Sequence, residues 1–221
     1  MFCLFASPPE KDLDWSDQGV EGSARFLNRV WRLFYEQHHR LKNVKPLPFG
    51  TALEGDPKVL RQKTHKTIKK VAEDIERFHF NTAISAIMEL VNEIYVSEVK
   101  DRMDEISMRV MREAIETTVL LLSPFVPHFA EELWEALGNR ESIVKNPWPD
   151  YDQEAVLEEE ILIVIQVNGR LRDRITLPTS YGEEEVKAWA LKSEKIRKLT
   201  EGKEIKRVIL VPQKLVNIVC L

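Results

Sequence analysis

Apolar side chains recur every three or four residues through the first 150 positions, as in α-helices that bury one face. The first such stretch starts near Gly19, has Ser16 or Asp17 as its N-terminal cap, and ends before Asn43. The other expected helices cover 57–78, 81–95, 103–122 and 127–137, and Gly138 is placed to cap the last one. Five amphipathic helices joined in this way predict a helical bundle over residues 19–149.

The pattern changes after Trp148-Pro149. Residues 150–160 contain six acidic side chains and are expected to form a linker. The apolar run 161–167 then leads through the turn-forming pair Asn168-Gly169 into a second strand that stops at Pro178. A helical segment follows at 183–199, broken near Ser193, and further strands are expected at 205–211 and 215–219. The fold class is therefore mainly α, with a small α+β domain over 161–221.

Along the second strand, alternation predicts two different faces. One face takes Leu171, Ile175 and Leu177. The other takes the three arginines Arg170, Arg172 and Arg174.

Composition narrows the class of protein. The chain is 43% hydrophobic and 31% charged, as in ordinary globular proteins, and no apolar run approaches the roughly 20 residues of a membrane span. The N-terminus lacks the basic region of a signal peptide. Two cysteines, Cys3 and Cys220, make neither a disulfide framework nor a zinc site, so a reducing cytoplasm fits best and no membrane partner is expected.

Charge is distributed unevenly between the two expected domains. Residues 1–160 hold 20 Lys and Arg against 29 Asp and Glu, whereas residues 161–221 hold 12 against 7. A small basic module attached to an acidic body is typical of a protein whose one end contacts phosphates. The distribution does not identify the polyanion.

Motifs of catalysis are missing from the sequence. Gly50 and Gly55 have the spacing of a phosphate-binding loop, but Asp56-Pro57 replaces the Lys-Ser/Thr pair that contacts phosphate and magnesium. No Gly-x-Ser-x-Gly or His-Glu-x-x-His motif occurs. We therefore expect no catalytic, cofactor-binding or metal-binding residues in this chain.

Some polar residues still allow two interpretations. Three acidic residues before the first helix could bind a cation, but stabilisation of the helix N-terminus is the favoured interpretation of Asp12, Asp14 and Asp17. His128 is interpreted as a first-turn or packing residue, and four tryptophans are interpreted as core or loop anchors: Trp15, Trp31, Trp134 and Trp148.

Two basic features suit RNA. Arg25, Arg29 and Arg32 project from one side of the first helix and can contact a sugar-phosphate backbone, although their spacing alone slightly favours a solvated face paired with Glu21 and Glu36. The arginines of the second strand stand about 6.5–7 Å apart on one face, close to the spacing of successive phosphates. Protection of an edge strand would also place cations there. Further positive charge in this domain comes from Lys203, Lys206, Arg207 and Lys214.

Three segments resemble the bacterial leucyl-tRNA synthetases. The segments are LFASPPEKDLDWSDQGVEG at 4–22 with RFLNRVW at 25–31, QVNGRLRDRI at 166–175, and KLVNIV at 214–219. SPFVPHFAEELW at 123–134 is similar to a segment shared more widely by the leucyl, valyl, isoleucyl and methionyl enzymes. Together they extend the resemblance across nearly the whole chain.

The resemblance implies a C-terminal fragment that docks tRNA(Leu) for an ATP- and Mg-dependent leucine-tRNA ligase and is inactive alone. Residues 1–18 would end the catalytic domain, 19–149 would form the anticodon-binding bundle, and 161–221 would contact the tRNA elbow. By the same resemblance, Arg25, Arg29, the Arg170 hairpin and the segment from Lys214 to Asn217 match RNA-contacting positions. The catalytic and editing domains of the parent, expected to be monomeric, would lie upstream.

Two alternatives remain open. One is a free-standing helical protein-interaction module whose basic hairpin binds a protein. The other is the equivalent region of a valyl- or isoleucyl-tRNA synthetase.

Overall fold

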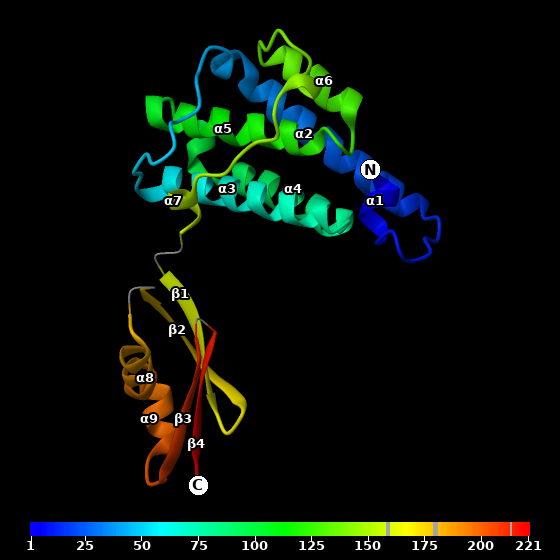
Figure 1. Ribbon diagram of the computed structural model, residues 1–221. Coiled ribbons are helices and arrows are strands. Elements are labelled where there is room, and N and C mark those ends of the chain that lie inside the picture. The colour runs from blue at the N-terminus through cyan, green and yellow to red at the C-terminus, as the bar shows by residue number, and fades with distance from the viewer. Residues whose placement is uncertain (158–159, 179–180, 213) are drawn as a thin grey trace. The chain divides into compact units, whose positions relative to one another are not determined.

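The computed structural model describes residues 1–157, 160–178, 181–212 and 214–221 and divides the chain into two compact units, Met1–Leu157 and Glu158–Leu221 (Figure 1). Unit 1 is helical, and unit 2 is a sheet covered by helices. The elements of unit 1 are α1 (Phe2–Ala6), α2 (Asp17–Leu41), α3 (Gly55–Glu76), α4 (Phe80–Val96), η1 (Glu98–Asp101), α5 (Glu105–Leu122), α6 (Pro127–Ala136), η2 (Ile143–Lys145) and α7 (Gln153–Val156).

Local signals in the sequence explain where the long helices begin and end. Ser16 caps α2 by accepting a hydrogen bond from the N–H of Gly19 at 3.1 Å, and Asp104 caps α5 in the same way. Pro57 occupies the first turn of α3, where a missing N–H costs nothing. Gly138 ends α6 at a φ of 94°. The five predicted helices are therefore confirmed as α2 to α6.

The core of unit 1 lies between these helices. α5 is buried on almost every side, since α2, α3, α4 and α6 all pack against it. The largest fully buried side chains include Phe34 of α2, Leu60 of α3, Ile87 of α4 and Met111 of α5. One apolar cluster thus holds the bundle together.

The helical unit extends beyond the predicted bundle of residues 19–149 at both ends. The segment before α2 contains α1, which the apolar periodicity did not predict and which packs against α2 and α4. After Trp148, Asp152 is buried and α7 packs against α3, so residues 150–157 belong to the helical unit and are not a free linker. Residues 158–159 of the expected linker lie outside the described residues.

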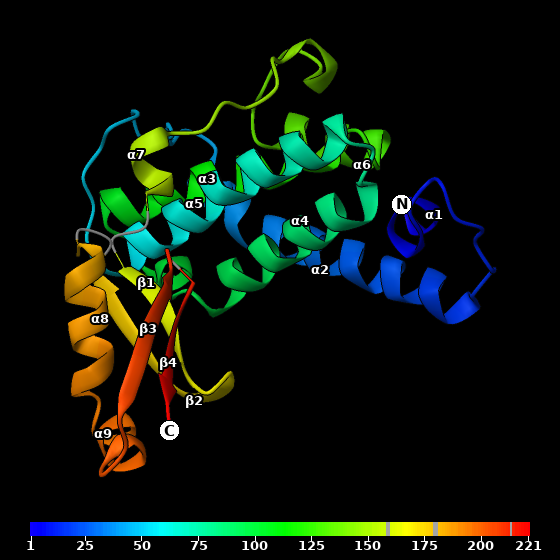
Figure 2. The same cartoon turned by 60° about the horizontal axis from the view of Figure 1, so that its bottom comes forward.

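Unit 2 has the predicted element order. Its elements are β1 (Glu160–Val167), β2 (Arg170–Pro178), α8 (Glu183–Lys192), α9 (Glu194–Thr200), β3 (Ile205–Val211) and β4 (Leu215–Cys220). The strands lie in the order β2-β1-β4-β3; β4 is parallel to β1, and the other pairs are antiparallel. α8 and α9 cover one face of the sheet in both views (Figures 1 and 2). The break expected at Ser193 separates α8 from α9.

The predicted alternation along β2 is wrong in its first half. The register with β1 shifts between Ile165 and Gln166, and Arg172 is an extra residue with no Cα partner there, a β-bulge. The bulge reverses which side chains face the helices. Leu171 is 51% exposed, whereas Leu177 beyond the bulge is 4% exposed and packs against the helices.

Within the described part of the chain, no helix has the combined length and hydropathy that crossing a membrane requires.

Candidate nucleic-acid interface

The β1–β2 turn and its neighbouring strand ends form the first candidate surface, which we call the hairpin end. Val167 pairs with Arg170, and Arg207 of β3 pairs with Val219 of β4, so the cations of both edge strands lie at the same end of the sheet. With neighbouring strands about 4.8 Å apart, the two edges are roughly 14 Å from one another. The exposed cations of the hairpin end are Arg170, Lys203, Lys206 and Arg207.

The hairpin end has a rigid frame. Asn168 and Gly169 have φ values of 51° and 76°, as in a type I′ turn. The Asn168 side chain donates to the carbonyl of Cys220 at 2.9 Å and accepts from its N–H at 3.0 Å. The Gly169 N–H donates to Oδ1 of Asn217 at 3.0 Å. Asn217, assigned to RNA by resemblance, therefore already uses its side-chain oxygen to hold this turn.

The three arginines of β2 do not share one face. Directly opposed residues of an antiparallel pair point to the same side. Arg170 therefore lies on the side of buried Val167, and Arg174 lies on the opposite side with Val164. Arg172 is exposed at the bulge between them. The predicted row of three is thus wrong, although all three side chains are exposed.

The face of the sheet opposite α8 and α9, the open face, carries apolar side chains between two cations. Arg174 lies on one edge strand and Arg207 on the other, with Gln166 and Asn217 on the central strands. Its exposed apolar members are Leu162 (56%), Leu171 (51%), Ile209 (37%) and Val211 (40%). Lys214 is exposed where β4 begins. An exposed face of this kind allows contact with a polyanion at its charged edges.

The arginines of α2 divide by role. Arg29 donates to Oδ1 of Asn92 at 2.9 Å and lies 4.9 Å from the ring centre of Tyr95, so it joins α2 to α4. Arg25 forms a 3.5 Å ion pair with Glu21, and both side chains are about 70% exposed. Arg32 is exposed. Arg25 and Arg32 therefore remain the better candidates for contact with RNA.

A cavity of about 500 Å³ lies beside these arginines, lined by apolar side chains from α1, α2 and α4. Phe2, Phe26 and Met88 line it together with Arg25 and Arg29. Apolar walls next to guanidinium groups suit a flat aromatic ligand with negative charge.

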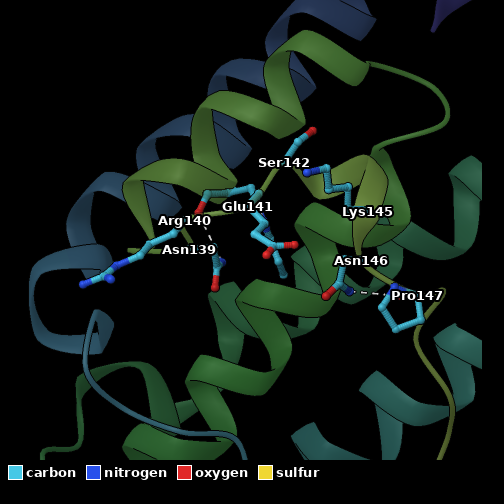
Figure 3. Close-up of a pocket in the computed structure, with 8 residues that line it drawn as sticks. Asn139, Arg140, Glu141, Ser142, Lys145, Asn146 and Pro147 are labelled. Atoms are coloured by element: carbon cyan, nitrogen blue, oxygen red, sulfur yellow. Dashed lines mark hydrogen bonds between the residues drawn. The ribbon is translucent and has the colours of Figure 1, made fainter.

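A second cavity, of about 390 Å³, lies where α6 leads into η2 (Figure 3). Lys145, Ser142 and Asn146 line it from η2 and its flanks, and Glu141 adds a negative charge. The Arg140 side chain extends away from the other labelled residues in Figure 3. Lining groups of both signs do not favour one class of ligand.

Sequence reasoning missed a buried polar network in unit 1. Arg61 forms 3.1 Å ion pairs with Glu113 of α5 and with Asp152 before α7. His65 Nε2 donates to Glu113 at 3.1 Å, and Nδ1 accepts the N–H of Asp152 at 3.2 Å, so the neutral imidazole satisfies both contacts. The available signal was the position of Arg61 and His65 inside the apolar stripe of their helix.

Two of the tryptophans interpreted as core or loop anchors lie in different surroundings. Trp15 lies in a loop and not in the core: it is 70% exposed, and its indole N–H donates to Asp17 at 2.8 Å, in keeping with the loop-anchor interpretation. Trp134, by contrast, is 5% exposed and lies in the core.

Within the described ranges, no three His, Cys, Asp or Glu residues are grouped as ligands for a metal ion.

Comparison with known proteins agrees with a tRNA-binding fold. Residues 57–187 match the family described as the anticodon-binding domain of tRNA ligase. The chain is 54% identical over 220 residues to a leucine–tRNA ligase of Geotalea daltonii and 51% identical over 221 residues to one of Syntrophobacter fumaroxidans. In both cases 99% of this chain and 26% of the relative are covered.

A solved structure matches the fold as well. The Agrobacterium radiobacter LeuRS–tRNA–LeuAMS ternary complex superposes with a TM-score of 0.85 at 29% identity, over all of this chain and 28% of that one. The chain thus spans about a quarter of the length of the proteins it matches. Because this family matches residues 57–187, which are more than half of the chain, the chain belongs to the anticodon-binding domain family of tRNA ligases.

Proposed function

We propose that this chain is the C-terminal tRNA-docking part of a leucine–tRNA ligase, an enzyme that attaches leucine to tRNA(Leu) with ATP. The observation that carries the proposal is the 54% identity to a leucine–tRNA ligase along 99% of the chain. Valyl and isoleucyl enzymes are less favoured, because the two relatives at 54% and 51% identity are leucine–tRNA ligases.

In this proposal the chain positions the tRNA and carries out no chemical step itself. Cations of the hairpin end and of α2 contact phosphates of the folded RNA, and the acceptor end reaches an active site elsewhere in the parent enzyme. ATP and Mg would bind to the catalytic domain, which together with the editing domain is a partner of this chain. We place the parent in the cytoplasm, as a monomer.

A binding titration tests the docking role. The full chain is titrated with tRNA(Leu) at several salt concentrations, beside a variant with Arg170→Gln, Lys206→Gln and Arg207→Gln. Each lost phosphate contact reduces the slope of log K against log salt by about 0.9, so the variant should bind more weakly with a flatter salt dependence.

The control variant removes the same number of positive charges, three, from α8 and α9. Lys187 and Lys198 form ion pairs within their helices, and Lys192 lies 5.7 Å from the Trp189 ring. Changing these three residues to Gln should leave the slope unchanged. Equal effects of the two triple variants would contradict docking at the hairpin end. A chain that ignored tRNA even at low salt would refute the function and favour a protein-interaction module.

A further inference from the structure

The connection between α3 and α4 holds an aromatic residue in a strained backbone conformation. The N–H of Phe78 donates to the carbonyl of Ile75 at 3.0 Å, and the N–H of His79 donates to the carbonyl of Asp74 at 2.8 Å. This pair of hydrogen bonds ends α3 in a Schellman motif and puts Phe78 at a φ of 59°. Glycine is the usual residue there, because a bulky side chain is strained at positive φ.

The other described non-glycine residue with positive φ has a structural reason for it. Asparagine tolerates this conformation better than most residues. The side-chain amide of Asn168 also bonds to both the carbonyl and the N–H of Cys220. Phe78 has neither explanation. Phe78 is 62% exposed, so the strain is not offset by burial in the core. Residues held in such conformations concentrate at binding sites.

The exposed ring of Phe78 has a firm support. Phe80 meets it edge to face, with ring centres 5.7 Å apart at 71°. Phe80 in turn meets Phe125, which is 6% exposed, at 6.3 Å and 74°. These two contacts connect the Phe78 ring through Phe80 to the core and hold one side of the ring in place. A pre-positioned ring binds a flat ligand with little loss of side-chain entropy.

We propose that Phe78 is a stacking platform for an unpaired nucleobase of the bound tRNA. The proposal rests on the tRNA-docking function above. Loop bases of RNA are recognised by stacking on aromatic side chains and on guanidinium planes, and Arg77, the residue before Phe78, is also exposed. Glu73 and Glu76 are exposed in the last turn of α3 and repel phosphates, so the base and not the backbone is the group that contacts this tip.

Substitution of Phe78 in the full chain tests the platform. Phe78→Asn and Phe78→Gly remove the ring but suit the positive φ, and Phe78→Trp keeps an aromatic ring. With tRNA(Leu) as the probe, we expect the Asn and Gly variants to bind about 5- to 100-fold more weakly. Their melting temperatures should equal or exceed that of the original chain, because strain is relieved. The Trp variant should bind normally.

Salt dependence separates stacking from phosphate contact. Loss of a stacked base should weaken binding by the same factor at every salt concentration and leave the slope unchanged. Phe49→Asn is the matched control, since Phe49 is also exposed, at 56%, but does not have a positive φ. This control should not weaken binding.

Three outcomes would overturn the platform. The first is normal tRNA affinity in both the Asn and Gly variants while the original chain binds. The second is a loss of affinity that follows a loss of melting temperature in both variants and is not prevented by Trp, which indicates a structural role. The third is an original chain that does not bind tRNA, which refutes the docking function itself.

Discussion

Asp152 shows how one buried carboxylate determines where the helical unit ends. It accepts hydrogen bonds from the N–H of Gly50 at 2.7 Å and of Glu154 at 3.0 Å, and pairs with Arg61. Arg61 also donates to the carbonyl groups of Pro48 and Thr51. The α2–α3 loop and the segment before α7 are thereby attached to α3. Because each partner is buried, removal of one leaves the others without compensation.

Asp152→Asn should reduce stability in a pH-dependent way. Burial alone would raise the pKa of Asp152, but three backbone N–H groups and the charge of Arg61 outweigh it and hold the pKa below its usual value. A carboxyl with a lowered pKa in the folded state stabilises the fold above the unfolded pKa of about 3.9 and loses this effect as pH falls through the folded pKa. Urea unfolding should therefore show a difference between the two proteins that is constant from about pH 7 to 5 and shrinks below about pH 4.

Asp150→Asn is the control for charge alone. Asp150 is exposed two residues away. Its substitution should change the free energy of unfolding little at any pH. A difference between Asp152→Asn and the original chain that did not vary with pH would show that the charge of Asp152 is not what holds the segment.

At the scale of elements, α1 is attached through a glycine of α2. A Cβ placed on Gly19 would lie 2.5 Å from Cε2 of Phe2, closer than any real contact. Gly22, one turn later, has only Arg25 nearby, at 3.8 Å. The absence of a side chain at Gly19 therefore leaves room for the Phe2 ring of α1 against α2.

A double-mutant cycle measures this packing. Gly to Ala in a helix stabilises by roughly 0.5–1 kcal/mol when space allows. Gly19→Ala should give this gain only when Phe2→Ala is also present, whereas Gly22→Ala should give it in either background. Urea unfolding of the variants checks both expectations. Equal effects of Gly19→Ala with and without Phe2 would show that α1 does not pack as described.

The sequence predicted elements better than contacts, for physical reasons. Helix periodicity, Ser16, Gly138 and Asn168-Gly169 act locally, so the elements they mark were predicted correctly. The bulge at Arg172 was not predictable from alternation, because an extra residue leaves no mark in the residues themselves. α1 spans 5 residues, too few for a helical period to be recognised.

The candidate site shows the same division. All the predicted cations of unit 2 are exposed, as expected for residues in polar positions. Which of them share a face depends on strand register and on the bulge, both of which are long-range properties. Arg29, which stays a predicted RNA contact, also contacts Asn92 and Tyr95, residues more than 60 positions away that the sequence did not point to.

At the scale of the whole molecule, each unit has its own apolar core. The core of unit 1 is large enough for folding alone, provided that the Asp152 network is kept. A chain of residues 1–157 should therefore melt cooperatively, with a melting temperature within a few degrees of the helical transition in the full chain.

A chain of residues 1–149 is the matched comparison. It keeps the predicted bundle but lacks Asp152, so Arg61 and the N–H of Gly50 lose a buried partner. We expect it to be destabilised by several kcal/mol relative to 1–157. Circular dichroism melts of the two chains test this, and equal melting temperatures would contradict a stabilising role for residues 150–157.

The position of β4 in the sheet has a consequence for biosynthesis. Among the described strands, β4 comes last in the chain and lies between β1 and β3, so the three earlier strands are synthesised before the strand that joins them. Until residues 215–220 are released, β3 has no strand partner and the β1–β2 hairpin exposes its inner edge. The sheet of unit 2 can therefore close only after β4 has left the ribosome, whereas the helical unit can fold before that.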